Sequence, residues 1–285
     1  MSRSTDISPL SLLLARIDAT ADQSPDIPAG AVPSGFPSLD RMLGGGLRRG
    51  DLIALGGAVA SGKSALALAM AVRAAQEGKR AAFYTGEMAA ERVLERILAI
   101  EGRARMDDLQ RGTLDDATRA SVGAAAIRLR ETLPVVDRLP ANGADGLAAE
   151  LRASPRFDLV VVDPLEMLAV GRLPTAEELA TAIRTLKHLA VDLDCAILVT
   201  SNLPGLTPRD DPRPRLDDFG ALGAVREHAD VVLGLFREGM YDPARALEGA
   251  TELIVRKARH GATGYVDLYF YAQWMRFEDM LDPDR

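Results

Sequence analysis

A glycine-rich segment between an apolar run and an alanine-rich stretch constrains this chain more than any other feature. It reads Gly57-Ala58-Val59-Ala60-Ser61-Gly62-Lys63-Ser64 and fits the pattern G-x-x-x-x-G-K-[ST] at each fixed position. The apolar run 51–55 before it indicates a buried strand, and residues 65–72 after it favour a helix. Strand, glycine loop and helix form the context that a phosphate-binding loop requires. We therefore predict a nucleotide-phosphate site here.

The residue types in this loop suit that chemistry. Glycines let backbone N–H groups converge on phosphates without a Cβ in the way, and the start of a helix adds positive potential. Lys63 would reach the β- and γ-phosphates, and the Ser64 hydroxyl would ligate Mg²⁺. The predicted cofactors are ATP and Mg²⁺. The predicted nucleotide-binding residues are Gly57, Ala58, Val59, Ala60, Ser61, Gly62, Lys63, Ser64 and Ala65.

Two further apolar runs end in a carboxylate. The run 157–163 ends at Asp163, which would hold Mg²⁺ through water beside the phosphate loop. The run 82–86 is followed by Glu87, the best candidate for orienting or deprotonating an attacking water. Alternatively, Glu87 is only an early residue of the next helix, where the helix dipole favours an acid. The chemistry of the residues leaves both interpretations open.

A late strand closes with alternating cations. Lys257 and Arg259 point to the same side because side chains alternate along a strand. Two adjacent cations need an anion, and a γ-phosphate bound to a neighbouring subunit would supply one. The alternative is a solvated edge strand on which lysine guards against aggregation.

Apolar runs and helical stretches alternate along the rest of the chain. This order predicts an α/β fold with a mostly parallel twisted sheet flanked by helices, closed by an antiparallel hairpin after residue 250. We expect one domain over 33–285, preceded by a leader, 1–32, that holds a short helix and a linker. The expected strands are 51–56, 80–86, 157–163, 195–201, 230–236, 251–257 and 265–271. The expected helices are 64–77, 89–102, 116–131 and 176–192.

Composition narrows the class of protein. Of the 285 residues 47% are hydrophobic, which suffices for a large core, and the single cysteine excludes an internal disulfide. No signal-peptide pattern and no apolar run of membrane-spanning length is present, so we expect a cytoplasmic protein without a membrane partner. The net charge of −7 argues against a broad basic face for nucleic acid, but it allows a few arginines in a narrow channel.

Several blocks, in this order and spacing, resemble the C-terminal motor domain of the DnaB replicative helicase family, which has a RecA-like fold. The blocks are Gly35-Phe36-Pro37-Ser38-Leu39-Asp40, Leu43-Gly44-Gly45-Gly46-Leu47, the phosphate loop, Gly86-Glu87-Met88, Asp163-Pro164-Leu165-Glu166-Met167-Leu168, Ala229-Asp230-Val231-Val232-Leu233 and Lys257-Ala258-Arg259-His260-Gly261. The resemblance implies that Glu87 is the catalytic base and that Lys257 and Arg259 contact the nucleotide of the adjacent subunit. It also implies a homo-oligomeric ring, commonly a hexamer, that works on single-stranded DNA with replication proteins as partners.

Departures from the family pattern concern the metal, sensor and DNA segments. Glu166 stands where the family has an amide, and the polar sensor Ser-Gln reads Ser201-Asn202, which makes Asn202 the expected sensor. The DNA-contacting loop reads Asp217-Asp218-Phe219-Gly220-Ala221-Leu222-Gly223 and lacks the family's arginine and glutamate. Candidate replacements lie just upstream, and they suit a solvated loop equally well. These candidate DNA contacts are Arg209, Arg213 and Arg215.

These departures motivate a rival function from another class. RadA-like recombination ATPases and KaiC-like ATPases share features of this chain, although it lacks the zinc-binding cysteines of the former. The rival is a RecA-like nucleotide switch or scaffold that acts on a protein partner and unwinds no DNA. Stimulation of ATP turnover by single-stranded DNA would distinguish the motor from the switch.

Overall fold

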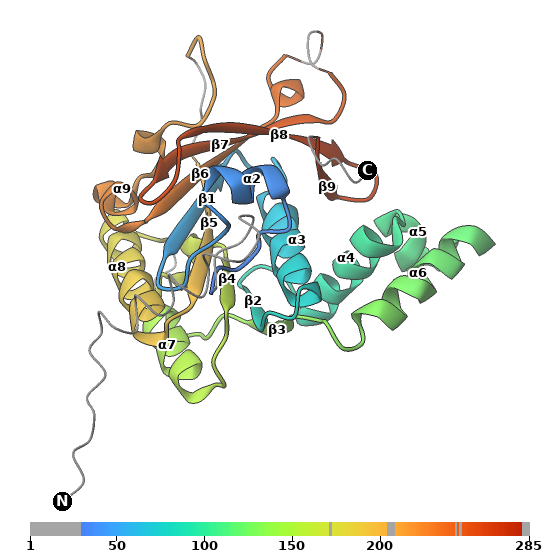
Figure 1. The fold of residues 1–285 in the computed structure, drawn as a ribbon, viewed down its shortest axis with the longest axis horizontal. Coiled ribbons are helices and arrows are strands. Elements are labelled where there is room, and N and C mark those ends of the chain that lie inside the picture. The colour runs from blue at the N-terminus through green and yellow to red at the C-terminus, as the bar shows by residue number, and fades with distance from the viewer. Residues whose placement is uncertain (1–29, 171–172, 204–208, 243, 245–246, 281–285) are drawn as a thin grey trace, which may run out of the picture.

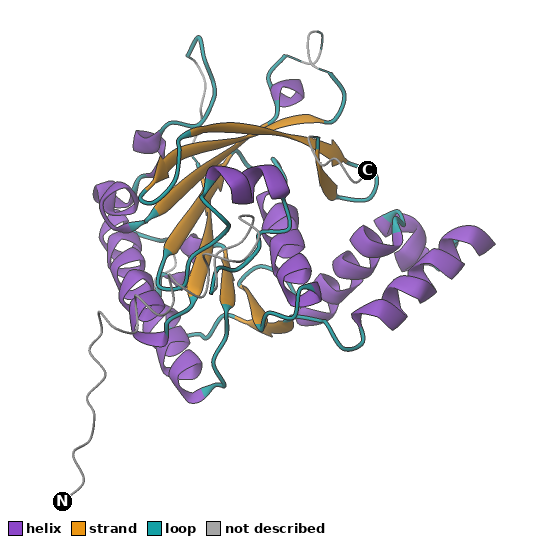
Figure 2. Cartoon of the chain, viewed as in Figure 1, coloured by secondary structure: helices purple, strands orange, loops and turns teal. Residues whose placement is uncertain are grey.

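The computed structural model describes residues 30–170, 173–203, 209–242, 244 and 247–280. The predicted leader helix near residues 10–17 therefore lies outside the described residues. Within them, nine strands form one twisted sheet in the order β3-β2-β4-β5-β1-β6-β7-β8-β9 (Figure 1). Helices cover both faces of the sheet (Figure 2). The predicted α/β architecture is confirmed.

The central strands are apolar runs that run parallel to one another. They are β1 (Leu52–Gly57), β2 (Ala81–Thr85), β4 (Leu159–Asp163), β5 (Ala196–Asn202) and β6 (Val231–Phe236). Almost every residue in them is buried, as expected of parallel strands covered on both faces. At the edge, β3 (Val135–Arg138) also pairs in parallel with β2. The sequence did not reveal β3, because most of its residues are exposed and it has no apolar run.

Beyond β6 the sheet continues with antiparallel strands. These are β7 (Ala250–Ala258), β8 (Gly264–Tyr271) and β9 (Arg276–Asp279). The hairpin expected after residue 250 is the pair β7–β8. The last strand was missed because only Phe277 in it is apolar.

Helices from separate parts of the chain cover the two faces. On one face, α2 (Pro37–Met42) and α3 (Lys63–Gln76) pack with the inner sides of β7–β9 in one core. On the other, α7 (Gly143–Ala153), α8 (Ala176–Leu193) and α9 (Ala224–His228) enclose a second core. The phosphate loop leads directly into α3, so the site is carried by a helix with eleven buried residues.

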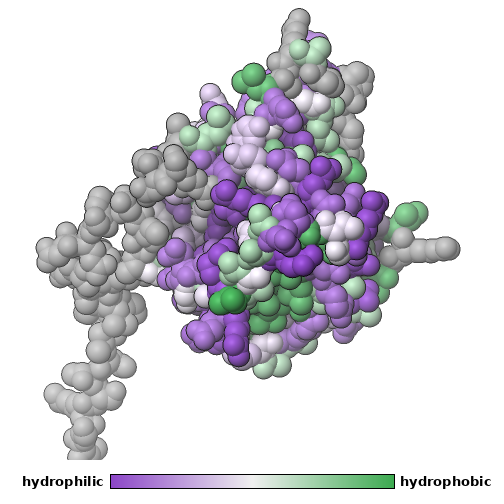
Figure 3. All heavy atoms as spheres, turned by 90° about the vertical axis from the view of Figure 1, so that its right-hand side faces the viewer, coloured by the Kyte–Doolittle hydropathy of each residue, from purple (hydrophilic) through white to green (hydrophobic). Residues whose placement is uncertain are grey.

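Three helices extend from the sheet on the side of β2 and β3 (Figure 1). They are α4 (Ala90–Gly102), α5 (Met106–Arg111) and α6 (Asp116–Leu129). Seen from this side, the surface is largely hydrophilic with one hydrophobic area (Figure 3). On α6, Ile127 is 77% exposed. Across the described helices, none has both the length and the apolar character needed to cross a membrane.

The strand β9 ties distant parts of the chain together. The backbone N–H and hydroxyl of Ser38 donate to the Asp279 carboxylate at 2.7 and 2.8 Å, across 241 residues of sequence. Arg73, on α3, donates to the Phe277 carbonyl at 2.7 Å. The Phe277 ring itself lies against Gly62 of the phosphate loop. The phosphate loop therefore follows β1 and is supported by a side chain from β9, the last described strand in the sequence.

Candidate nucleotide site

The parallel strands bring the predicted site residues to one edge of the sheet. The phosphate loop follows β1, Glu87 follows β2, Asp163 ends β4 and Asn202 ends β5. Because these strands share one direction, their carboxyl ends lie side by side, where ligands bind in open α/β sheets. A hydrogen bond from the Gly86 N–H to the Asp163 carbonyl, 2.8 Å long, joins the ends of β2 and β4.

Two glycines of the loop are required by its backbone. Gly62 has φ +104°, and a Cβ there would lie 2.8 Å from the Phe277 ring. A Cβ on Gly57 would lie 2.8 Å from the Ser61 hydroxyl and 2.9 Å from the Leu235 carbonyl. Any other residue would therefore widen the loop. The tip is open, since Val59 is 71% exposed, while Ala65 is buried in the first turn of α3.

Ser61 lies buried beneath this loop. Its hydroxyl has no hydrogen-bond partner among the described residues. A buried hydroxyl without a partner indicates that a bound group or water completes the loop. The conformation of the loop thus fits a phosphate cradle.

Lys63 lies under the loop and is only 6% exposed. Its Nζ donates to the carbonyls of Gly57 and Ala58 at 3.0 and 2.8 Å. Burial lowers the pKa of Lys63, and the nearby carboxylates of Glu166, Asp163 and Glu87 oppose that decrease. A buried ammonium held by two carbonyls is available to an incoming phosphate.

Ser64 and Asp163 bring together two oxygen atoms that could ligate a metal ion. The Ser64 hydroxyl donates to Asp163 Oδ1 at 2.9 Å, and Thr200 donates to the same atom at 2.5 Å. Burial raises the pKa of Asp163, while the hydrogen bonds from Thr200 and Ser64 and the charges of Lys63 and Arg96 lower it.

This pair fits Mg²⁺ better than a metal held wholly by protein. Mg²⁺ commonly takes one or two protein oxygens and completes its shell with waters and phosphate oxygens. Within the part of the chain that is described, no group of three His, Cys, Asp or Glu could hold a metal ion. The Ser64 hydroxyl at the start of α3 and the Asp163 carboxylate at the end of β4 therefore suit a magnesium ion that arrives with its nucleotide.

Glu87 lies in the bend after β2 and is exposed. The helix α4 begins at Ala90, so Glu87 precedes the helix instead of forming its first turn. Its carboxylate is one of the three that oppose the decrease that burial causes in the pKa of Lys63.

Glu166, which in the sequence is only a departure from the family pattern, also lies beside these residues. It lies in a short 3-10 helix after β4, Leu165–Leu168. Its Oε1 accepts hydrogen bonds from the Ser201 hydroxyl and the Asn202 N–H, both at 2.9 Å. Its Oε2 is buried and has no hydrogen-bond partner in the described structure. The carboxylate in place of an amide was the one signal in the sequence that marked this position.

Lys257 and Arg259 lie at the amino ends of the parallel strands, opposite the carboxyl ends that carry the phosphate loop. Arg259 Nε donates to Asp230, which immediately precedes β6, at 2.7 Å. The same carboxylate accepts from the Leu52 N–H, at the beginning of β1, at 2.9 Å. The six residues of β1 then lead to the loop. At about 3.3 Å per residue, the five steps from Leu52 to Gly57 separate the two ends of the strand by roughly 17 Å.

These contacts correct the expectation that Lys257 and Arg259 need an anion from a neighbouring subunit. Arg259 does not lack an anion within its own chain, because Asp230 supplies one, and Lys257 donates to the Arg226 carbonyl at 2.7 Å. Burial alone would raise the pKa of Asp230, but hydrogen bonds from Lys187, Leu52 and Arg259 outweigh it and lower that pKa. The need for an anion is therefore no argument for a neighbouring subunit, whereas the position at the far edge is.

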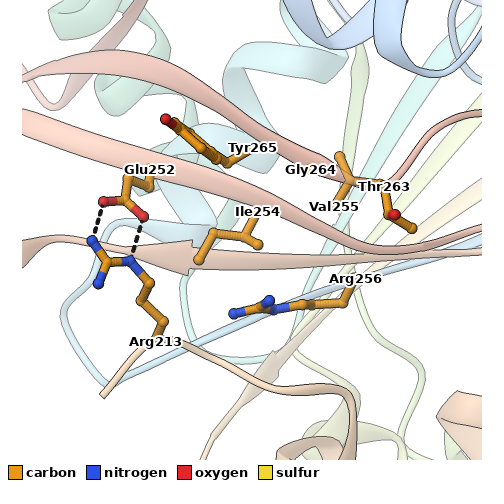
Figure 4. A pocket seen from close by; sticks show the side chains of 8 residues that line it. All are labelled: Arg213, Glu252, Ile254, Val255, Arg256, Thr263, Gly264 and Tyr265. Carbon is orange, nitrogen blue, oxygen red and sulfur yellow. Dashed lines mark hydrogen bonds and ion pairs between the residues drawn. The ribbon is translucent and has the colours of Figure 1, made fainter. Parts of the chain in front are cut away.

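Two of the three candidate DNA arginines are paired with carboxylates. Arg209 makes two hydrogen bonds to Asp218, at 2.9 and 2.7 Å. Arg213 makes two to Glu252, at 2.7 and 2.5 Å, beside a cavity of about 600 Å³ on the outer face of β7 and β8 (Figure 4). Arg215 is exposed. The guanidinium groups of Arg209 and Arg213 are thus already paired with carboxylates of the same chain.

Known proteins resemble this chain over most of its length. The family model of the DnaB-like helicase C-terminal domain matches residues 31–279. The replicative DNA helicase DnaB of Leifsonia xyli subsp. xyli (strain CTCB07) is 30% identical over 256 residues, covering 87% of this chain and 56% of that protein. The replicative DNA helicase DnaC of Bacillus subtilis (strain 168) is 28% identical over 257 residues, with the same two coverages. The chain thus spans 56% of the length of these relatives.

Solved structures show the same fold. One solved ATPase domain superposes with a TM-score of 0.86 at 23% identity, covering 96% of this chain and 99% of that chain. A DnaB-like replicative helicase, described with its interactions with primase, gives 0.83 at 22% identity and covers 97% of this chain and 67% of that one. Given the match to the family model over residues 31–279, the chain belongs to the DnaB-like helicase C-terminal domain family.

Proposed function

We propose that this chain is an Mg²⁺-dependent ATP hydrolase of the DnaB type that works as a ring, commonly of six subunits, on single-stranded DNA. The observation that carries the proposal is the split site. The phosphate loop, Ser64 and Asp163 lie at one edge of the sheet, and Lys257 and Arg259 lie at the other. A chain that cannot bring both halves to one nucleotide needs a second copy to do so.

The residues of one subunit would bind and orient the nucleotide. The loop N–H groups and Lys63 would hold the phosphates, with Lys63 leaving the Gly57 and Ala58 carbonyls as it does so. Ser64 and Asp163 would hold Mg²⁺, which neutralises phosphate charge when it is bound. Glu87 would accept a proton from the attacking water, and Asn202 would report the state of the γ-phosphate along β5.

The neighbouring subunit would complete the site. Its Lys257 and Arg259 would stabilise the charge that develops on the transferred phosphoryl group. To reach a phosphate, Arg259 would exchange its contact with the Asp230 carboxylate, and its 49% exposed side chain leaves it free to move. Replication proteins are the class of partner that we propose for such a ring.

Mixing inactive variants tests this arrangement. Lys63→Ala and Arg259→Ala should each hydrolyse ATP poorly, and their mixture should regain activity because an intact phosphate loop then faces an intact Arg259. The matched control mixes Arg259→Ala with the double variant Lys63→Ala/Arg259→Ala, in which no intact loop can face Arg259. Co-assembly without recovery would contradict action in trans.

Single-stranded DNA tests the motor itself. We expect the oligonucleotide to stimulate ATP turnover and electron microscopy to show rings in the presence of ATP. A rate of ATP turnover that is unchanged by single-stranded DNA would instead support a nucleotide switch acting on a protein partner. That outcome gains some weight from the internal pairing of Arg209 and Arg213.

A further inference from the structure

Glu166 has a buried carboxylate oxygen that the proposed chemistry leaves unused. Its Oε1 is fixed by Ser201 and Asn202 at the end of β5, which holds the whole carboxylate in place. Its Oε2 meets no donor among the described residues. A buried acceptor without a donor is costly, so a bound group is expected to satisfy it. An acceptor calls for water, a hydrated cation or an ammonium, and not for a phosphate.

The charge of Glu166 acts on the phosphate side of the site. The Asn202 N–H donates to Glu166, and Asn202 pairs with Gly57, the first residue of the phosphate loop, so this carboxylate lies beside the loop. Burial lowers the pKa of Lys63, and the carboxylates of Glu166, Asp163 and Glu87 oppose that decrease. The nearby cations are Lys63 itself and Arg96, which acts on Asp163. Among the described residues of one subunit, three carboxylates thus act at a site with the cations Lys63 and Arg96, to which the neighbour would add Lys257 and Arg259. The charge of Glu166 opposes the binding of phosphate there.

We propose that Glu166 is a specificity-determining residue that makes the site reject metal-free nucleotide and accept the magnesium complex. This inference rests on the proposed ATP-binding function. Metal-free ATP carries more negative charge than its magnesium complex, so a carboxylate beside the phosphates penalises the free form more strongly. A water in the shell of the cation would give Oε2 the donor that it lacks. An amide at this position would exert no such penalty.

The measurement compares affinities with and without metal. Isothermal titration calorimetry gives the Kd of the non-hydrolysable analogue AMP-PNP in EDTA and in excess Mg²⁺. For Glu166→Gln, we expect metal-free binding to tighten by about tenfold, since that variant removes one near charge and keeps the shape. Binding with Mg²⁺ should change less, so the ratio of the two Kd values falls.

Two further variants separate charge from structure. Glu166→Asp keeps the charge and should retain a ratio near that of the parent protein, although it shortens the reach to Ser201 and Asn202. Glu131→Gln removes the same charge from an exposed turn after α6 and should leave the ratio unchanged.

Three outcomes decide the matter. A ratio for Glu166→Gln equal to that of Glu131→Gln would overturn the proposal. So would equal loss of binding in Glu166→Gln and Glu166→Asp, because this would mean that Glu166 serves only to hold β5. A parent protein that binds no AMP-PNP even with Mg²⁺ would refute the proposed function itself, and the role of Glu166 with it.

Discussion

Replacing Asp230 by Asn should destabilise the fold strongly although Asp230 is far from the phosphate loop. Its carboxylate is 2% exposed and accepts hydrogen bonds from Lys187 at 2.6 Å, Arg259 at 2.7 Å and the Leu52 N–H at 2.9 Å. The amide oxygen of Asn can still accept from Leu52. The variant loses the charge-assisted bond to Lys187, whose side chain is only 21% exposed, and such bonds contribute about 1.5–3 kcal/mol.

The bond to Arg259 adds less, because that side chain is 49% exposed and solvent screens exposed ion pairs to about 0–1 kcal/mol. Together we expect the free energy of unfolding to fall by about 2–3 kcal/mol. For a domain of this size that lowers Tm by roughly 5–10 °C. Urea titration and calorimetry would measure both quantities. Asp267→Asn removes the same charge from an exposed position of β8 and should cost less than about 0.5 kcal/mol.

The pH dependence of this stabilisation has a definite sign. The folded pKa of Asp230 is lowered, so its contribution is fully present above the unfolded pKa of about 3.9. It is lost as the pH falls through the folded value. The difference between parent and Asp230→Asn should therefore stay constant from neutral pH downward and shrink only below about pH 4. An Asp230→Asn variant as stable as Asp267→Asn at neutral pH would refute the reasoning.

The nucleotide site yields three further predictions. Lys63→Ala should abolish ATP hydrolysis and weaken nucleotide binding while circular dichroism shows a retained fold; normal turnover would disprove the role of Lys63. Glu87→Gln should keep ATP affinity but lower kcat by about 10²-fold or more, the usual scale for a lost general base, and an unchanged kcat would remove Glu87 from the chemistry. Gly62→Ala should weaken binding of ADP measured by calorimetry, because φ +104° and the contact with Phe277 exclude a Cβ; parental affinity would show that the loop adapts.

Most of the sheet could be predicted because its strands are buried on both faces. Continuous apolar runs such as Leu159–Asp163 are visible in a sequence, and α3 and α8 follow from their apolar spacing. The short edge strands β3 and β9 could not be predicted, since exposed or charged residues form them and pairing with a neighbour, not composition, makes them strands.

The sequence predicts the chemistry of the site better than it predicts the hydrogen-bond partners of the arginines. A motif and a parallel sheet together predict that Ser64 and Asp163 are neighbours. In the structure, the Ser64 hydroxyl oxygen lies 2.9 Å from Asp163 Oδ1. The contact of Arg259 with Asp230 could not be predicted, because it depends on the register of β6 with β7. The internal partners of Arg209 and Arg213 are likewise set by a loop whose path no periodic pattern describes.

The contacts of β9 determine at what stage of folding the domain becomes able to bind phosphate. The ring of Phe277 supports Gly62, and Asp279 holds Ser38 across 241 residues of chain. Contacts of such separation close large loops and form late in folding. A nascent chain would therefore carry an assembled β1 and α3 yet lack a firm cradle for phosphate until nearly all of the domain had been made. Pulse-labelling hydrogen exchange would reveal this as protection of the loop amides that arises together with β9, and earlier protection of the loop would contradict it.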